Sequence, residues 1–204
     1  MAKQTAKPNY KRGVTPIGEA LFAHLKATEV ILDKDTGKYT LMLKLKEADK
    51  AALLKDIEAE WKAFKASDEM KGKKTASDWS NGIKEYKDEG YFKFSANAEI
   101  KTKRGDTFEN KVPVFDSMQQ NISDKIKELG NGSLVRVAYE LVPFYMSNKI
   151  HGISLRLRAV QLHKYVEAGG SAESFGFEQD DSGFALPEDE SAPFMDSSED
   201  GGDF

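Results

Sequence analysis

The chain has 204 residues and a formal net charge of −4, to which 30 Lys or Arg and 34 Asp or Glu contribute. It contains no Cys, which excludes a disulfide framework, a thiolate nucleophile and a Cys-ligated zinc. No stretch approaches the roughly 20 apolar residues that span a bilayer, and residues 1–16 are basic rather than apolar, so we expect no signal peptide and no membrane partner.

Charge is divided unevenly along the chain. Residues 171–204 contain eleven Asp or Glu and no Lys or Arg, so residues 1–170 hold 30 basic and 23 acidic residues. A body of charge +7 is therefore followed by a tail of charge −11. Like charges with isolated apolar residues cannot build a core, so we predict that residues 169–204 form a disordered acidic tail. Five of the twelve Phe lie in the tail, which favours a binding segment over a solubility tail.

The first half of the body changes its hydrophobic period several times. Residues 1–16 are predicted to be a flexible basic arm, and a strand is expected within residues 18–32. A turn follows at Asp35-Thr36-Gly37. Residues 38–46 alternate, which predicts a strand with Tyr39, Leu41, Leu43 and Leu45 facing inward. From residue 47 to about residue 65, apolar residues recur at helical spacing and predict one long amphipathic helix.

The second half begins with residues 67–90, which are polar and poorly periodic and read as a long functional loop around Trp79. Residues 91–100 alternate again and predict a strand whose Phe92, Phe94 and Ile100 face inward while Tyr91 faces outward. We expect a hairpin tip at 103–106, a strand at 107–115, a short helix at 121–129 that stops at 130–132, and final strands at 134–144 and about 152–166.

These elements amount to five or six strands with one long helix. A single helix cannot cover both faces of a parallel sheet, so a doubly wound fold is unsuited to this inventory. We therefore predict a mainly β protein with α structure: an OB-fold barrel of five to six strands over residues 17–168.

Catalytic and metal sites find little support in the sequence. His24, His151 and His163 are isolated and have no metal-ligand spacing. Asp33-Lys34-Asp35 resembles the start of a calcium loop, but Lys44 stands where the closing Glu is required, so we read a hairpin turn. Phosphate-cradling and dinucleotide glycine motifs are absent. The sequence thus predicts no enzyme, no metal and no cofactor, although Asp116 and Glu140 keep a nuclease-like acidic site open as an alternative.

Basic and aromatic side chains on the predicted strands suit single-stranded nucleic acid. Cations follow the phosphates, and flat rings stack on unpaired bases. The candidates on outward strand positions, at a hairpin rim and at a strand end are Lys44, Lys46, Tyr91, Lys93, Lys101, Lys103, Arg104, Lys111, Phe144, Tyr145, Lys149, Arg156 and Arg158.

Three stretches of sequence carry a resemblance to a known family. They are Tyr91-Phe92-Lys93-Phe94-Ser95-Ala96, then Leu141-Val142-Pro143-Phe144 leading into Ile153-Ser154-Leu155-Arg156-Leu157, and the terminal Asp200-Gly201-Gly202-Asp203-Phe204. Their order resembles that of the bacteriophage replicative single-stranded DNA-binding proteins, which have an OB-fold and an acidic tail ending in Phe. The resemblance covers most of the chain.

The resemblance implies roles for particular residues. In that family the Phe-Lys-Phe strand and the region after Leu-Val-Pro line the DNA groove, which implies DNA contacts for Lys93 and Phe144. This chain departs from the family pattern at Ser95 and Asn97, where a Lys and a Tyr are usual, and at Met146, where a Trp is usual. The candidates to supply the missing base stacking are Tyr145, Tyr91 and Trp79.

The resemblance also implies a role for the tail. The family's terminal aromatic residue docks on replication proteins, and its acids compete with DNA for the groove. These roles would fall on Glu199, Asp200, Asp203 and Phe204. The implied partners are single-stranded DNA, a replication polymerase and a primase-helicase, with a homodimer bridged by swapped tails as a further implication. The implied location is the cytoplasm of a bacterial host.

The leading hypothesis is a non-enzymatic protein of a phage replication system that coats and protects single-stranded DNA. Its tail would recruit replication proteins and occupy the groove when DNA is absent. The alternatives are an RNA-binding or strand-annealing protein, a metal-dependent replication nuclease, and an interaction adaptor without DNA binding.

Overall fold

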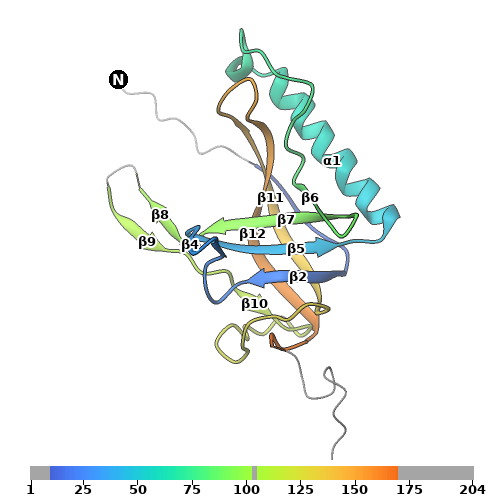
Figure 1. Cartoon of the computed structure of the whole chain (residues 1–204), viewed down its shortest axis with the longest axis vertical. Helices are drawn as coiled ribbons and strands as arrows, with labels where there is room; N and C mark the ends of the chain where they lie inside the picture. The colour runs from blue at the N-terminus through green and yellow to red at the C-terminus, as the bar shows by residue number, and fades with distance from the viewer. Residues whose placement is uncertain (1–9, 103–104, 170–204) are drawn as a thin grey trace, which may run out of the picture. The chain divides into compact units, whose positions relative to one another are not determined.

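A computed structural model describes residues 10–102 and 105–169 (Figure 1). Five strands close a barrel, namely β2 (Gly18–His24), β5 (Lys38–Lys44), β7 (Glu89–Asn97), β11 (Leu134–Tyr145) and β12 (His151–Lys164). Their order is β11-β2-β5-β7-β12, and β12 pairs with β11 to complete the ring. Neighbours are antiparallel except β7 and β12, which run parallel. The predicted fold, a mainly β OB-fold barrel with one long helix, is confirmed.

Strand alternation supplies the barrel core. The predicted inward residues of β5 are all buried, and Phe92 and Phe94 of β7 are 1% and 0% exposed. On β12 the buried residues are Ile153, Leu155 and Leu157. Because successive strand residues point to opposite faces, the residues between them must lie on the outside of the barrel. The outer face of β5, β7 and β12 is therefore determined by the same alternation that builds the core.

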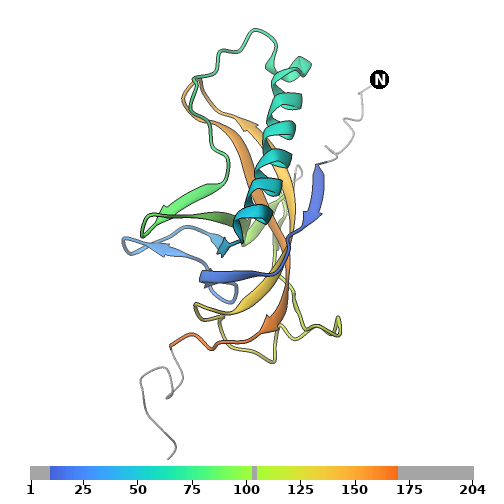
Figure 2. The same ribbon diagram turned by 90° about the vertical axis from the view of Figure 1, so that its right-hand side faces the viewer.

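Helix α1 (Glu47–Lys65) packs against β11 and β12 through Leu53, Ile57 and Trp61 (Figure 2). Its first turn carries acids and its last turn carries bases, in the sense that the helix dipole favours. A short 3-10 turn, η1 (Asp68–Met70), follows it. Among the described residues, no helix has the length and apolarity needed to cross a membrane.

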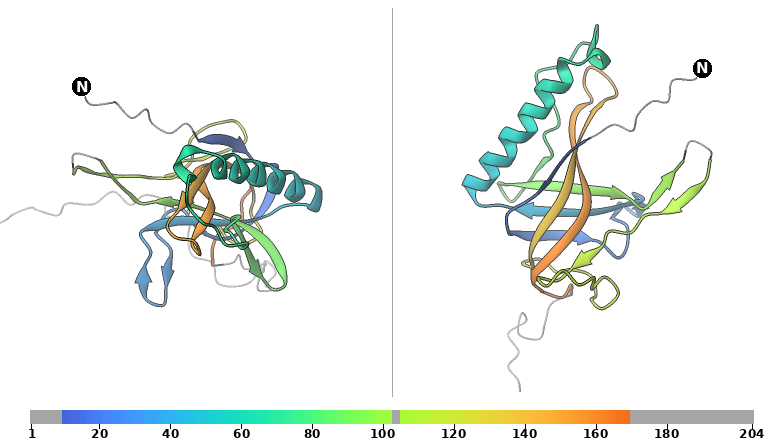
Figure 3. Two further views of the ribbon diagram at one scale, coloured as in Figure 1. Left: turned by 90° about the horizontal axis from the view of Figure 1, so that it is seen from above. Right: turned by 180° about the vertical axis from the view of Figure 1, so that it is seen from behind.

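Two hairpins and two short strands extend the barrel. The hairpins are β3 (Val30–Ile31) with β4 (Lys34–Asp35), and β8 (Glu99–Lys101) with β9 (Thr107–Glu109). Strand β6 (Ile83–Tyr86) pairs with β7, and β10 (Val114–Phe115) pairs with β12. The β3–β4 hairpin and the β6–β7 hairpin project from the same side of the barrel, as the view from above in Figure 3 shows.

The predicted basic arm is wrong for its last residues. Strand β1 (Lys11–Val14) pairs with β11, with Arg12 opposite Glu140. The hydroxyl of Thr15 accepts a hydrogen bond of 2.9 Å from the Val137 amide and is buried, which holds this segment in the sheet. Residues 1–9 lie outside the described residues, as do Lys103, Arg104 and the whole predicted tail segment from residue 170 onward.

The predicted helix at 121–129 is also wrong. A nine-residue helix is marginal without tertiary support, and here other bonds satisfy the backbone instead. The Ile122 amide donates to the Val114 carbonyl at 2.9 Å, and the Glu128 carbonyl accepts a hydrogen bond of 3.1 Å from the Ala168 amide. The Glu128 carboxylate also accepts bonds from the amides of Leu25 and Lys26. Tertiary hydrogen bonds therefore replace the helical ladder.

Two further predictions need correction. Residues 67–90 contain regular structure, because β6 extends the β7 hairpin. Ile100 was expected to face inward but is 50% exposed, because β8 leaves the barrel to form a separate hairpin. Phe108 lies opposite Ile100 on β9 and is 57% exposed.

Gly152 is expected to be essential for stability. Its φ is +144°, and a Cβ there would lie 2.2 Å from the Ser80 carbonyl oxygen, which accepts a hydrogen bond from the Ile153 amide. We expect Gly152→Ala to lower the free energy of unfolding by about 2–4 kcal/mol through backbone strain and steric overlap. Denaturant unfolding measures this.

Gly72→Ala is the matched control. Gly72 also has a positive φ, of +77°, but nothing lies within 4 Å of its added Cβ. This variant should lose only about 1 kcal/mol from strain. Equal losses for the two variants would contradict the close approach at Ser80.

Candidate nucleic-acid interface

A groove crosses the outer face of β5, β7 and β12 between the β3–β4 and β8–β9 hairpins. It consists of two adjoining hollows of about 360 Å³ and 1100 Å³ that share Thr36, Lys38, Ser95 and Ser154. Among the described residues, the charged side chains that line the groove are seven cations, Lys38, Lys84, Lys93, Lys101, Lys111, Arg156 and Arg158, and three acids, Glu29, Asp35 and Glu99. The groove is thus positive on balance, as a binding site for a polyanion requires.

Strand register explains why these side chains come together. Arg12 lies opposite Glu140, Glu140 opposite Arg156, and Arg156 opposite Ser95. Ser95 in turn lies opposite Thr40. Residues that are paired in register share a face, so one row of side chains runs across β1, β11, β12, β7 and β5. Arginines and hydroxyls therefore meet on the outer face although they are distant in sequence.

A buried carboxylate organises the arginines. The Glu140 side chain is only 5% exposed, and it accepts hydrogen bonds from Arg12 Nε at 3.1 Å and from Arg156 Nη1 at 3.2 Å. Arg158 Nε lies 3.8 Å from the same carboxylate. The guanidinium of Arg156 also stacks 5.0 Å from the ring centroid of Tyr10. Because the arginine side chains are 41–74% exposed, each keeps donors available for a ligand while Glu140 fixes its position.

A second ion pair lies deeper in the groove. Lys93 Nζ donates to Glu29 Oε1 at 2.6 Å, and the two side chains are only 26% and 16% exposed. Glu29 comes from the segment before β3, and backbone hydrogen bonds to Lys38 and Thr36 hold it there. A phosphate bound at Lys93 would have to displace this carboxylate or share the ammonium group with it. Lys93 is therefore already neutralised in the absence of ligand.

Six of the predicted site residues line the groove. They are Lys93, Lys101, Lys111, Phe144, Arg156 and Arg158. Lys101 ends β8 near the tip of the β8–β9 hairpin, Lys111 follows β9 at the base of the hairpin, and both are exposed. Lys111 pairs with Glu109 at 3.5 Å, and both side chains remain at least two-thirds exposed. These six residues therefore share one groove, and their contact with nucleic acid stays a prediction.

Lys44 and Tyr91 belong to a different cluster. Tyr91 is 5% exposed, so the prediction that its ring faces solvent is wrong. Its hydroxyl donates to Glu89 at 2.7 Å, and Lys44 donates to the same carboxylate. The hydrogen bond from Lys44, and then that from Tyr91, lower the pKa of Glu89, while Glu89 raises the pKa of Lys44 and of Tyr91. All three groups therefore keep their usual protonation states across the physiological range.

Two of the predicted aromatic residues, Trp79 and Tyr145, pack near α1 and do not line the groove. Trp79 stacks on Trp61 with ring centroids 5.4 Å apart, and His151 stacks on Trp61 at the same distance. Tyr145 stacks on His151 at 6.1 Å, and its hydroxyl donates to the Lys74 carbonyl. Aromatic stacking thus joins the helix, the loop and the β11–β12 turn, and it keeps Trp79 and Tyr145 out of the groove. The exposed Lys46 and Lys149 do not line the groove; they lie before α1 and after β11.

Several groove residues were not singled out from the sequence. Lys38 alternates with the inward residues of β5, as Thr40 and Met42 do, so its outward position could have been predicted from the sequence. Lys84 lies on β6, which was read as loop. Arg12 does not line the groove but shares Glu140 with two arginines that do, and it lies on β1, which was read as arm. The position of Glu29 in the groove could not be predicted from the sequence, because Glu29 reaches Lys93 only when the hairpin is folded.

The acidic pair considered for a nuclease is not assembled. Glu140 is engaged by arginines, and the Asp116 carboxylate accepts hydrogen bonds from the amides of Met118 and Gln120. Across residues 10–102 and 105–169, no three His, Asp or Glu side chains gather as a metal site. The carboxylates therefore hold turns and arginines in place.

The order of the strands in the barrel defines the chain as an OB-fold protein, and the groove on its outer face is a candidate nucleic-acid interface. Neither a protein-family model nor a curated protein sequence matches the chain. Solved structures do. The chain is similar to gp2.5, a single-stranded DNA-binding protein encoded by bacteriophage T7, with 20% identity over 87% of this chain and 100% of that chain and a TM-score of 0.60.

A second similar protein is the single-stranded DNA-binding protein from bacteriophage Enc34. Its structure in complex with single-stranded DNA matches at 17% identity over 78% of this chain and 89% of that chain, with a TM-score of 0.54. Without DNA it matches at 15% identity with a TM-score of 0.52, over 81% of this chain and 90% of that chain. The family resemblance predicted from the sequence is thus matched by the fold, over most of the chain.

Glu140→Gln tests how the arginines are organised. Removing the charge leaves Arg12, Arg156 and Arg158 without their shared counter-ion, so we expect the free energy of unfolding to fall by about 1–3 kcal/mol. Glu109→Gln, at an exposed pair with Lys111, should change it by less than about 0.5 kcal/mol. Chemical denaturation of both variants measures the difference, and an unchanged Glu140→Gln would contradict the organising role.

Proposed function

We propose that the chain is a single-stranded DNA-binding protein of a phage replication system that coats exposed strands with little sequence preference. The observation that carries the proposal is the positive groove on the outer face of β5, β7 and β12, in a barrel of the same fold as two phage single-stranded DNA-binding proteins. Cations along such a groove attract phosphates without reading bases, which suits a protein that must bind any sequence.

The chemistry of the groove supports phosphate binding. Arg156 and Arg158 present planar guanidinium groups, which bind phosphate through paired hydrogen bonds. Lys38, Lys101 and Lys111 are exposed point charges along the same path. Phe144 supplies apolar surface beside Lys93 where bases could pack. Phosphates and bases therefore both find partners on one surface.

The acids in the groove point to competition between carboxylate and phosphate. Glu29 pairs with Lys93, so a strand bound there exchanges one anion for another. Glu140 is buried behind the arginines and leaves their outer donors to phosphate. The acidic tail extends this idea. We propose that its carboxylates occupy the groove in the absence of DNA and that phosphates displace them. The released tail, with Glu199, Asp200, Asp203 and Phe204 at its end, then recruits the replication polymerase and the primase-helicase.

Groove charge variants test DNA binding. Lys38→Ala/Arg158→Ala removes two exposed cations, each contributing about 1 kcal/mol, so affinity for a single-stranded oligonucleotide should fall about 10- to 30-fold. The slope of log affinity against log salt should become less steep by about 1.4. Fluorescence anisotropy across a salt series measures both.

Lys55→Ala/Lys62→Ala is the matched control, since it removes the same charge from exposed positions of α1. It should leave the affinity nearly unchanged. Equal losses for both double variants would mean that net charge, and not the groove, drives binding. A matched RNA oligonucleotide bound more tightly than DNA would favour the RNA-binding alternative.

Deletion of residues 171–204 tests the competition between tail and DNA. The truncated protein should bind single-stranded DNA more tightly, and the difference should shrink as salt screens the tail. Deleting Phe204 alone should leave DNA affinity unchanged but weaken binding to the polymerase. Titration of the full-length and truncated proteins with DNA measures this, and equal affinities would overturn the competition.

A further inference from the structure

An exposed aromatic pair lies beside the groove and takes no part in the interface described above. Phe22 on β2 is 38% exposed, and its ring meets Tyr86 of β6 edge to face, with centroids 4.9 Å apart. Tyr86 also contacts the buried Tyr91 at 6.3 Å. The Nζ of Lys87 lies 5.3 Å from the centroid of the Tyr86 ring. Two rings and a cation are thus gathered at one exposed place.

The backbone at Phe22 is strained. Its φ is +47°, in the left-handed region that bulky residues avoid because the Cβ crowds the backbone. The residue lies in a bulge where the β2–β5 register shifts between Leu21 and His24, and its amide donates to Asn131 Oδ1 at 2.8 Å. A strained backbone conformation usually persists because burial of the side chain stabilises it or because the residue has a function. The Phe22 side chain is still 38% exposed, so burial alone does not explain the strain.

The partner ring is positioned by a similar device. Lys87 and Asp88 have φ values of +50° and +61°, the geometry of a tight type I′ hairpin turn between β6 and β7. This turn folds β6 back along β7 and brings Tyr86 against Phe22. Two independent backbone features with unfavourable φ therefore converge on one aromatic pair.

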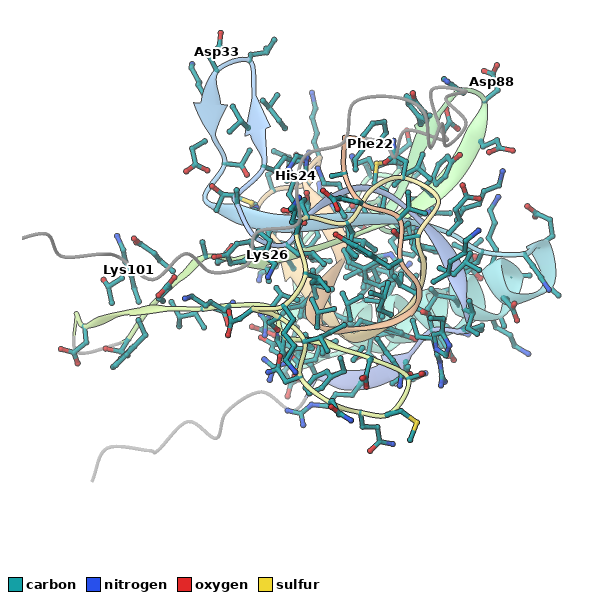
Figure 4. The ribbon with its side chains drawn as sticks, turned by 90° about the horizontal axis from the view of Figure 1, so that it is seen from below. Phe22, His24, Lys26, Asp33, Asp88 and Lys101 are labelled. Atoms are coloured by element: carbon teal, nitrogen blue, oxygen red, sulfur yellow. The ribbon has the colours of Figure 1, made fainter. Side chains whose placement is uncertain are left out.

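The pair is continuous with the groove. Tyr86 and Lys84 are two residues apart on β6 and so share a face, and Lys84 lines the groove. Phe22 and His24 lie between the projecting β3–β4 and β6–β7 hairpins, whose tips carry Asp33 and Asp88 (Figure 4). A strand that leaves the groove past Lys93 and Lys84 would meet the two rings next.

We propose that Phe22 and Tyr86 form a base-stacking site at this end of the groove, with Lys87 contacting the adjacent phosphate. The proposal rests on the proposed function and adds a stacking residue that neither strand alternation nor the family resemblance indicated. The ligand is one unpaired base of single-stranded DNA. Every base has a flat face, so this site would add affinity without adding sequence preference.

Two variants separate stacking from stability. Phe22→Gly removes the ring and also relieves the positive φ, so its unfolding temperature should stay near that of the parent protein while affinity falls. Phe22→Leu keeps apolar volume without a flat face and should lose affinity as well. Met118→Ala removes another exposed apolar side chain, away from the groove, and should change nothing.

The measurement is anisotropy with a single-stranded oligonucleotide and with versions that carry one abasic position. We expect Phe22→Gly and Phe22→Leu to weaken binding about 5- to 100-fold, the range of one lost base stack, with an unchanged salt slope. An abasic position that weakens the parent protein should have no effect on Phe22→Gly. Tyr86→Phe, which keeps the ring, should bind like the parent.

Normal DNA binding by both Phe22 variants would overturn the stacking site and leave the proposed function intact. A loss that appears only as a shallower salt slope would overturn it too, because that is the signature of a lost phosphate contact. Failure of the parent protein to bind single-stranded DNA at any salt would overturn the proposed function and the stacking site together.

Discussion

Strand β12 is the constraint on which both the core and the groove depend. It closes the barrel by pairing with β11 on one side and with β7 on the other, and it carries β10 in addition. Its alternation sends Ile153, Leu155 and Leu157 into the core, so Ser154, Arg156 and Arg158 must face the groove. A shift of one residue in its register would bury the arginines and expose the leucines. Hydrophobic burial therefore positions the charged side chains.

Carboxylates of the chain itself contact the cations that would bind phosphate. Lys93 and the arginines are held by Glu29 and Glu140, which keep the cations in place without satisfying all their donors. The arginines are 41–74% exposed, so phosphate can reach the donors that Glu140 leaves open. The acidic tail would apply the same chemistry on a larger scale, with residues of the chain standing in for the ligand.

The sequence allowed the barrel and several residues of the groove to be predicted, because alternation is a local signal. Lys93, Arg156 and Arg158 lie on the face that their parity indicates. The remaining features depend on contacts between distant segments. Strand β1 forms because β11 offers it an edge, Tyr91 is buried because β6 folds over it, and Glu29 reaches Lys93 only in the folded hairpin. The exposed position of Phe22 depends on its positive φ, which the residue pattern does not predict.

Lysine footprinting with and without single-stranded DNA tests most directly whether the outer face of β5, β7 and β12 is where the strand lies. Acetylation would be quantified residue by residue. We predict that DNA protects the exposed Lys38, Lys101 and Lys111, which line the groove, and leaves Lys55 and Lys62 on α1 as reactive as before. Protection of the α1 lysines with no change at the groove lysines would contradict the account.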